Sequence, residues 1–353
     1  MILTIIATII LLGPIIFFHE LGHFLAAKLS GVTVEKFSLG FPPTIISKRI
    51  GETEYALGAI PFGGYVRMRG EIPGNQEYQP SQGDLSSKSI PVRAIILAAG
   101  SIMNFVLAIF LFWAVLAFHG TTEASQAATV GSVIPESPAD SAGLVEGDSV
   151  VQISGMLVSN WDEMAEIVHP SHGKMLNFEI MRGDSAIIIG ITPASHTVAT
   201  DTGLITVGLI GIGPAAINRP MGVFAAVPGA FIMLGNVFGA MWQFAGKAFE
   251  TGLEPGDVGG PVLISKMAGI SARLGWATFI FFMAALSVNL GILNLLPFPV
   301  LDGGHLLFLC IEGIRRRPVS IKIRLAAQQI GFLIIVAFMI YITFNDFFVI
   351  FGD

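Results

Sequence analysis

The chain is poor in cysteine and in charged side chains, and both shortages exclude classes of protein. Its single cysteine, Cys310, cannot form an intramolecular disulfide. Charged residues make up only 12% of the 353 residues, about half the share of an average soluble domain. The net charge of −6 leaves no basic excess, so we expect no nucleic-acid partner. Apolar side chains, in contrast, are abundant. They make up 53% of the chain, with a mean hydropathy of +0.74, which predicts an integral membrane protein with polar inserts.

Four segments contain an apolar run of the roughly 20 residues that a membrane-spanning helix needs. They are 1–30, 93–119, 276–312 and 326–349. The first has no basic residue before its apolar run and is too long for a cleaved signal core, so we expect a retained helix. A further segment, 220–272, contains a Gly-rich amphipathic stretch. We predict that it lies at the membrane interface or re-enters the membrane instead of spanning it.

Basic residues predict the orientation of these helices, because cytoplasmic loops are enriched in Lys and Arg. Eight basic residues lie between 28 and 93 and five between 315 and 324, whereas the much longer stretch between the second and third helices has six. Both basic loops are therefore expected on the cytoplasmic side, with the long insert and both termini outside. The first and third helices then run in the same direction.

Two polar regions between the helices have recognisable patterns. The cytoplasmic-side loop, 31–92, contains two stretches of alternating polarity, 52–58 and 64–69, which predict a membrane-associated β-hairpin. The outer insert, 125–195, has four short strand patterns and one helix, 161–168, capped by Asn160. The predicted fold class is an α-helical polytopic membrane protein with four transmembrane helices, a cytoplasmic-side β-hairpin region and an inserted α+β domain.

The first helix carries the clearest chemical signal. Residues 19–23 read His-Glu-Leu-Gly-His, which matches H-E-x-x-H. Two histidines four apart share a helix face and can bind one Zn²⁺, and Glu20 between them can take a proton from a metal-activated water. The pattern arises by chance in about one chain in a hundred of this length. Ionisable groups inside an apolar span are costly and usually functional, so we interpret His19 and His23 as metal ligands.

A catalytic zinc site usually has three protein ligands, and the third should lie at the same membrane depth. His19 lies near the cytoplasmic end of its helix, and Asp302 follows the third helix, which runs in the same direction. The prolines and glycines of 297–304 end that helix and are predicted to bend the chain so that the carboxylate reaches the metal. We favour Asp302 as the third ligand, with His305 and Glu312 as the alternatives.

Two amides lie in or at the end of the third helix. Asn289 and Asn294 are five residues apart, and amides in an apolar span need hydrogen-bond partners. One interpretation is that they hold an unwound substrate backbone or stabilise an oxyanion. The other is that they pack helices against one another.

Taken together, the motifs resemble the site-2 protease family, and within it the bacterial intramembrane zinc metalloproteases of the RseP and RasP type. The resemblance covers nearly the whole chain and implies zinc on His19, His23 and Asp302, with Glu20 as general base. It also implies that Asn289 and Asn294 lie near the substrate and that the hairpin pairs with the substrate as an added strand. The hairpin residues in question are Gly63, Gly64, Tyr65 and Val66. Four motifs carry the resemblance to the family, and they lie at 19–23, 64–71, 288–297 and 299–305.

The outer insert resembles a PDZ domain of the kind found in proteases, on the motifs 130–144 and 146–155. In the family this domain faces outward and restricts the access of substrates with bulky outer parts. Two features depart from many relatives. The insert has one PDZ pattern where relatives often have two, and residues 99–104 lack the Gly-Pro that often precedes Asn104.

The predicted function is therefore an intramembrane zinc endopeptidase in the bacterial inner membrane, with its active site near the cytoplasmic side. By the same resemblance its substrate is a transmembrane protein such as a pre-trimmed anti-sigma factor, and also remnant signal peptides. An alternative is an inactive membrane-anchored PDZ scaffold, which the intact His, Glu, His and Asp set argues against. A metal transporter would need ionisable groups spread along a path, whereas here they cluster at one depth.

Overall fold

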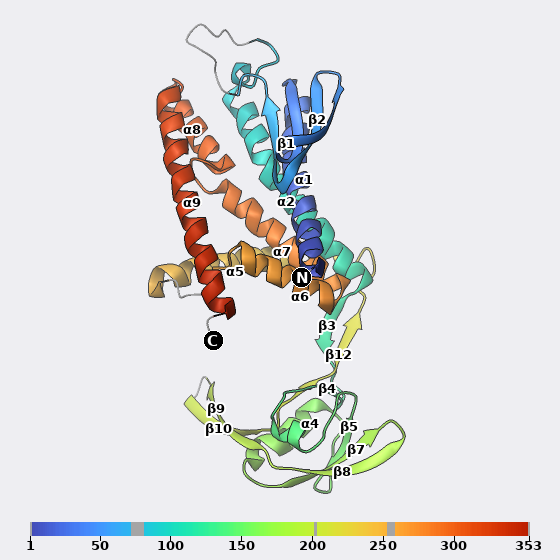
Figure 1. Cartoon of the computed structure of the whole chain (residues 1–353). Coiled ribbons are helices and arrows are strands. Elements are labelled where there is room, and N and C mark those ends of the chain that lie inside the picture. The colour runs from blue at the N-terminus through green and yellow to red at the C-terminus, as the bar shows by residue number, and fades with distance from the viewer. Residues whose placement is uncertain (1, 72–80, 201–202, 253–257, 352–353) are drawn as a thin grey trace. The chain divides into compact units, whose positions relative to one another are not determined.

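The computed structural model describes residues 2–71, 81–200, 203–252 and 258–351. The chain forms two compact units (Figure 1). We call residues 1–118 with 222–353 the helical unit, and residues 119–221 the inserted unit. The segment predicted as the outer insert, 125–195, falls inside the inserted unit, which extends further at both ends because additional strands pair there.

Five helices of the helical unit are long and apolar enough to cross a membrane. They are α1 (Ile2–Leu29), α2 (Ile90–Phe118), α5 (Ala226–Thr251), α7 (Trp276–Leu295) and α9 (Ile321–Phe351). Four of them coincide with the predicted spans, and the fifth, α5, falls in the segment predicted to be interfacial. In Figure 1, α5 and the shorter α6 (Pro261–Leu274) run crosswise to α1 and α2. The interfacial placement of α5 stays a prediction, because α5 is also long and apolar enough to span.

The core of the helical unit lies between α1, α2 and α7. Leu11, Phe112 and Val288, one from each helix, are buried in a single apolar cluster. Gly22 allows α1 and α2 to approach closely, because a Cβ there would lie 2.2 Å from the carbonyl oxygen of Ala99. The outward faces of these helices are apolar and exposed, as a lipid-facing surface requires.

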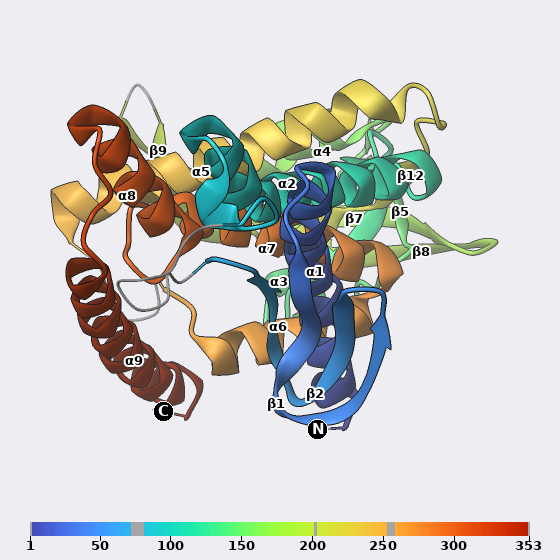
Figure 2. The same cartoon turned by 90° about the horizontal axis from the view of Figure 1, so that it is seen from above.

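The loop between α1 and α2, which the sequence predicts on the cytoplasmic side, contains the expected hairpin, made of β1 (Val34–Ile50) and β2 (Thr53–Met68). The first part of β1 lies between the two ends of β2, pairing with 54–57 on one side and with 64–68 on the other. Within the described part of the loop, which omits 72–80, the segment 64–68 has no strand on its outer side. The hairpin packs beside α1 (Figure 2), with Phe37 against Phe17 and Phe24. An open strand edge is thereby held next to the helix that carries H-E-x-x-H.

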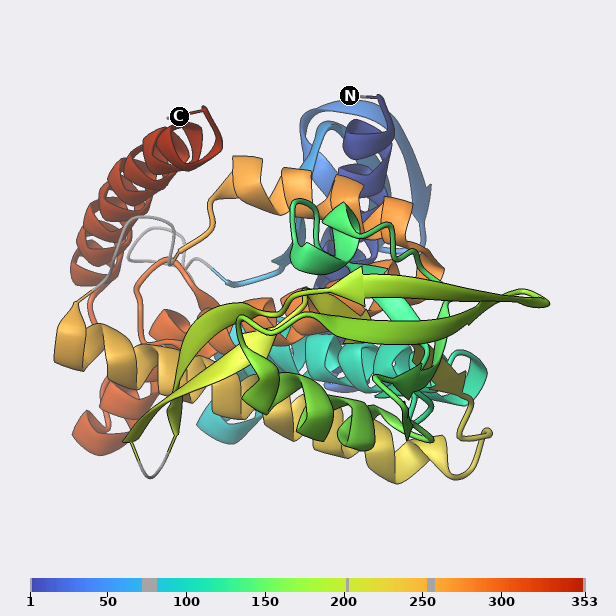
Figure 3. The same cartoon turned by 90° about the horizontal axis from the view of Figure 1, so that it is seen from below.

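The inserted unit is α+β, as predicted (Figure 3). Its main sheet has the order β6-β5-β7-β8, and helix α4 (Trp161–Val168) begins at its cap Asn160. The strands of this sheet are β5 (Ser149–Ile153), β6 (Met156–Leu157), β7 (Leu176–Arg182) and β8 (Ser185–Ile191). Outside the expected range, β3 (Thr121–Ala124) pairs with β12 (Ala216–Arg219). At the end of that range, β9 (Ala194–Thr200) begins, and it pairs with β10 (Gly203–Leu209). In addition, β4 (Val130–Val133) pairs with β11 (Ile212–Pro214), and a short helix α3 covers Pro138–Ser141.

One local prediction about the third helix is wrong. The glycines at 303 and 304 were expected to bend the chain, but they lie in the first turn of a helix, α8 (Asp302–Arg315). Their role is close packing. A Cβ on Gly303 would lie 2.2 Å from the carbonyl oxygen of Leu296, and one on Gly304 equally close to that of Phe298. Asp302 is therefore positioned as the first residue of a helix seated tightly on the turn that follows α7.

Candidate metal centre

The two histidines of α1 face α2 one helical turn apart. Their rings meet edge to face with centroids 4.8 Å apart. The Nδ1 atom of His23 lies 2.8 Å from the carbonyl oxygen of Ile96. When Nδ1 carries the ring proton it donates to this carbonyl, and Nε2 is left with a lone pair for a metal. His23 is 7% exposed, so its ring is held in one orientation by packing as well.

Asp302 reaches the same point from α8. Its Oδ2 atom lies 3.2 Å from Nε2 of His19 and 3.3 Å from Nε2 of His23, and the two Nε2 atoms are 3.2 Å apart. Among the residues that the structure describes, these three form the one group of His, Cys, Asp or Glu side chains able to hold a metal ion. Segments almost 300 residues apart in sequence thus converge on one point.

The residues present fit a zinc ion. Ligand atoms held about 2.0–2.1 Å from one ion at tetrahedral angles lie about 3.3 Å apart, close to the separations observed. Asp302 Oδ2 is buried, and its polar contacts within the described part of the chain are the two imidazole nitrogens, so three electron-pair donors converge on one point. Gly100 of α2 leaves the space, because a Cβ there would lie 2.3 Å from Nε2 of His23. A cation resolves the repulsion that these donors would otherwise exert on one another.

Glu20 lines a cavity of about 330 Å³ beside the three ligands. The same cavity is lined by Gly63 and Gly64 of the open strand edge and by Asn294 of α7. A Cβ on Gly64 would lie 2.9 Å from Cγ of Glu20, so the strand passes close to the Glu20 side chain. The structure thus brings Gly63, Gly64 and Asn294 to the candidate centre.

Three other predicted substrate-binding residues do not line this cavity. Asn289 lies half-buried further back along α7. Tyr65 pairs with Ser38 inside the sheet, and Val66 packs against the apolar cluster between α1, α2 and the hairpin. The backbone of Tyr65 and Val66 nevertheless belongs to the open strand edge.

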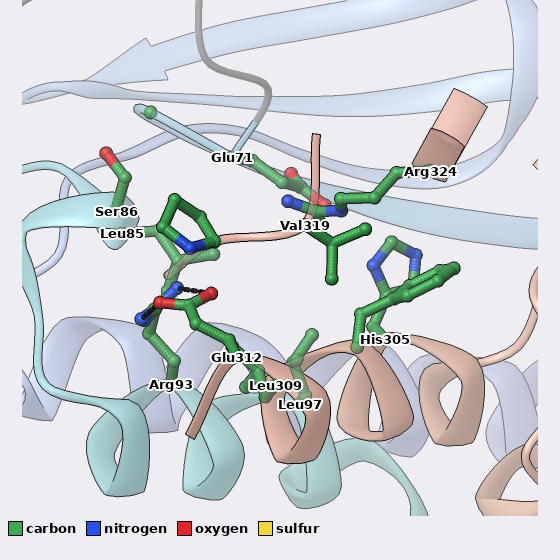
Figure 4. A pocket seen from close by; sticks show the side chains of 13 residues that line it. Glu71, Leu85, Ser86, Arg93, Leu97, His305, Leu309, Glu312, Val319 and Arg324 are labelled. Atoms are coloured by element: carbon green, nitrogen blue, oxygen red, sulfur yellow. Dashed lines mark hydrogen bonds and ion pairs between the residues drawn. The ribbon is translucent and has the colours of Figure 1, made fainter. Parts of the chain in front are cut away.

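The alternative ligands, His305 and Glu312, are engaged elsewhere. Glu312 pairs with Arg93 of α2 through both carboxylate oxygens (Figure 4). His305 has a ring nitrogen 3.2 Å from the side-chain nitrogen of Gln328. Both residues line a second cavity, of about 280 Å³, together with Glu71. Burial raises the pKa of the Glu71 carboxyl. The geometry therefore favours Asp302 over both alternatives.

The sequence interpretation missed two residues of α2 at this centre. Gly100 packs against both imidazoles, and the amide of Asn104 lies 3.5 Å from Nδ1 of His19. The only available signal was a polar Asn inside an apolar span, one turn after a glycine. The spacing of residues within α2 does not show which neighbouring helix Gly100 and Asn104 face.

Comparisons with known proteins give concordant results. The chain matches peptidase family M50 over residues 7–338. A Clostridium perfringens protein named as a zinc metalloprotease is 33% identical over 345 residues, 97% of this chain and 98% of that protein. A similarly named Mesorhizobium japonicum protein is 34% identical, with 98% of each chain covered. The zinc metalloprotease RasP of Geobacillus kaustophilus is 28% identical, with 97% of each chain covered.

Two solved PDZ domains, from SdrC-like proteins of Listeria monocytogenes and Listeria innocua, also match part of the chain. They are 22% and 21% identical, with TM-scores of 0.21 and 0.20. Each match covers 26% of this chain, and 90% and 93% of the respective solved chain. At such scores the likeness adds nothing to the argument, and the PDZ character of the insert continues to rest on its sequence motifs.

Proposed function

The chain belongs to peptidase family M50 and is a zinc metalloprotease of bacterial membranes, and from this premise we propose that it is an endopeptidase that cleaves the membrane-spanning segments of other proteins. The observation that carries the proposal is the convergence of Asp302 with His19 and His23, at 3.2 and 3.3 Å, beside Glu20. In this proposal His19, His23 and Asp302 hold the zinc, which when bound supplies Lewis-acid activation of water and of the scissile carbonyl.

Glu20 acts as the general base. It takes a proton from the attacking water as the water oxygen bonds to the carbonyl carbon, and it delivers that proton to the amide nitrogen as the C–N bond breaks. Asn294 lines the same cavity and can donate a hydrogen bond to the carbonyl oxygen as negative charge develops there. The second proton of the water passes from the new carboxylic acid to the new amine, so the products are a carboxylate and an ammonium group.

The open strand edge holds the substrate, mainly through the backbone of Gly63 to Val66 at its start. A helical peptide hides its amides in internal hydrogen bonds, so it must be extended before an amide is attacked. Addition of the substrate as a strand on the free side of 64–68 provides those hydrogen bonds in the extended form. The closeness of Gly64 to Glu20 supports this arrangement, because a strand added there passes over the general base.

The substrate, in this proposal, is a transmembrane protein already trimmed on its outer side, such as an anti-sigma factor, or a remnant signal peptide. The inserted unit lies outside and restricts the access of substrates with bulky outer parts. The metal centre lies near the cytoplasmic side of the inner membrane. The distribution of Lys and Arg supports this orientation.

Replacement of Glu20 by Gln tests the proposal. We expect Glu20→Gln to keep its zinc, because all three ligands remain, and to cleave a transmembrane test substrate about 10²- to 10⁴-fold more slowly. Cleavage is measured by mass spectrometry after reconstitution in liposomes, and zinc by elemental analysis. Glu146→Gln, on the exposed surface of the inserted unit, is the control and should cleave normally. Cleavage by Glu20→Gln at the wild-type rate would remove Glu20 from the mechanism.

A further inference from the structure

A buried amide of α2 faces the metal centre. Asn104 is 0% exposed, and its side-chain nitrogen lies 3.5 Å from Nδ1 of His19. Its side-chain oxygen is buried as well and has no hydrogen-bond partner among the residues that the structure describes. A buried polar group without a partner destabilises the folded protein. An amide at this position therefore indicates a state of the protein in which its oxygen also has a hydrogen-bond partner.

The position of Asn104 is fixed independently of its amide. Ser287 of α7 is also 0% exposed and donates from Oγ to the backbone carbonyl oxygen of Asn104 at 2.9 Å. One turn earlier on α2, Gly100 packs directly against both imidazole rings. The side chain of residue 104 is thus directed at His19 by contacts that a substitution of that side chain leaves intact.

The chemistry of His19 determines which partner it needs. A neutral imidazole carries one proton, on one of its two nitrogens. Nε2 lies 3.2 Å from both Nε2 of His23 and Oδ2 of Asp302, so metal binding uses the Nε2 lone pair and places the proton on Nδ1. The Nδ1 proton then needs an acceptor. The amide of Asn104 offers an oxygen on one side and an NH₂ group on the other, exchanged by a half-turn of the amide.

We propose that Asn104 is a positioning residue of the metal centre, whose side-chain oxygen accepts the Nδ1 proton of His19 when zinc is bound. This hydrogen bond fixes the orientation of the ring and the nitrogen that carries its proton. Zinc-ligating histidines commonly depend on such an acceptor. The inference rests on the metal site proposed above and adds a contribution from α2 to ligands supplied by α1 and α8.

Two substitutions distinguish an acceptor from a donor and from simple packing. Asn104→Leu keeps the volume but removes both functions, whereas Asn104→Asp keeps only the acceptor. Zinc affinity of the full-length protein is measured by competition with a chromophoric chelator. We expect Asn104→Leu to bind zinc about 10- to 100-fold more weakly. We expect Asn104→Asp to match or exceed the wild-type affinity.

Two further variants make the outcome decisive. Ser101→Ala removes another buried polar group of α2, a hydroxyl with no hydrogen-bond partner in the described part of the chain, and should leave zinc affinity unchanged. His19→Ala must lose zinc. If it does not, the proposed metal site itself is wrong, which is separate from a failure of Asn104. Asn104→Ala replaces the Leu variant if the latter does not elute as a monodisperse protein. Wild-type affinity in the Leu or Ala variant, or equal weakening in the Asp variant, would overturn the proposal.

Discussion

A buried aspartate of the inserted unit and two polar residues at the metal centre of the helical unit differ in their hydrogen bonding. In the inserted unit, Asp148 is 0% exposed and every contact is complementary. Arg182 binds both of its oxygens at 2.8 Å, and the backbone N–H of Val145 donates at 2.9 Å. In the helical unit, a buried oxygen of Asp302 and one of Asn104 have no hydrogen-bond donor among the described residues, although the Asp302 oxygen lies within 3.3 Å of two imidazoles. The fully hydrogen-bonded carboxylate of Asp148 indicates a contribution to folding. Buried acceptor atoms that lie close together without enough donors, as at Asp302, indicate a binding site for a ligand.

The surroundings of these groups differ as well. The inserted unit has an ordinary apolar core, with Phe178 and Ile153 at 0% exposure. The helical unit exposes apolar side chains outward and keeps polar ones such as Ser287 and Asn104 inside. A polar residue is unremarkable in the first environment and costly in the second. The same residue type therefore carries more functional information in the helical unit.

The largest expected effect comes from removing the third ligand. Asp302→Ala leaves only the two imidazoles as protein ligands. Zinc affinity should fall by more than about 100-fold, because a catalytic zinc site usually has three protein ligands. Elemental analysis after dialysis measures the loss, and cleavage should disappear with it. Hydrogen exchange of residues 119–221 should not change, because the inserted unit folds on its own core. Unchanged zinc content would transfer the ligand role to His305 or Glu312.

A smaller effect is expected where α2 makes room for the ligands. Gly100→Ala places a Cβ 2.3 Å from Nε2 of His23, so the ring must move and zinc affinity should fall about 10- to 100-fold, as when a ligand loses its support. Alanine is the better helix former by about 1 kcal/mol, so weaker zinc binding cannot come from a weaker α2. Gly235→Ala in α5 is the matched control, because its Cβ would meet no atom within 4 Å. Equal zinc affinity in both variants would contradict the close packing at Gly100.

Much of the helical unit was predictable because each signal is local or follows from one geometric rule. Apolar length predicted α1, α2, α7 and α9, and four-residue spacing put His19 and His23 on one helix face. The distribution of basic residues made the first and third spans parallel. From this parallel direction, Asp302 was predicted to lie at the depth of the histidines. In the structure its Oδ2 atom lies within 3.3 Å of both.

What could not be predicted depends on which helix faces which. Gly100 and Asn104 contact the histidines only because α2 crosses α1 at Gly22, and no spacing within α2 encodes that crossing. The helix α8 was missed because the prolines before Asp302 suggested an extended chain, and two glycines suggested a bend. In the structure those glycines serve close packing inside the helix. In the inserted unit, the pairing of β3 with β12 joins segments about 90 residues apart.

The smallest effect, and the one that separates the two units most cleanly, concerns Asp148. The Arg182 guanidinium beside it holds the pKa of the Asp148 carboxyl below its ordinary value. Such a group stabilises the fold above the ordinary aspartate pKa of about 3.9. That stability is lost as the pH falls through the lowered value. Asp148→Asn should lower the unfolding free energy of the inserted unit by about 1–2 kcal/mol at neutral pH.

The Asn variant should also lose part of the decline in stability that the wild type shows below about pH 4. Hydrogen exchange of residues 119–221 across that pH range measures both effects. Asp184→Asn, in an exposed turn of the same unit, is the control and should behave as wild type. Zinc affinity should be unchanged in both variants, because Asp148 contributes to folding of the insert and to nothing else. Weaker zinc binding by Asp148→Asn would contradict this distinction between the two units, because Asp148 would then affect the metal centre as well as the folding of the insert.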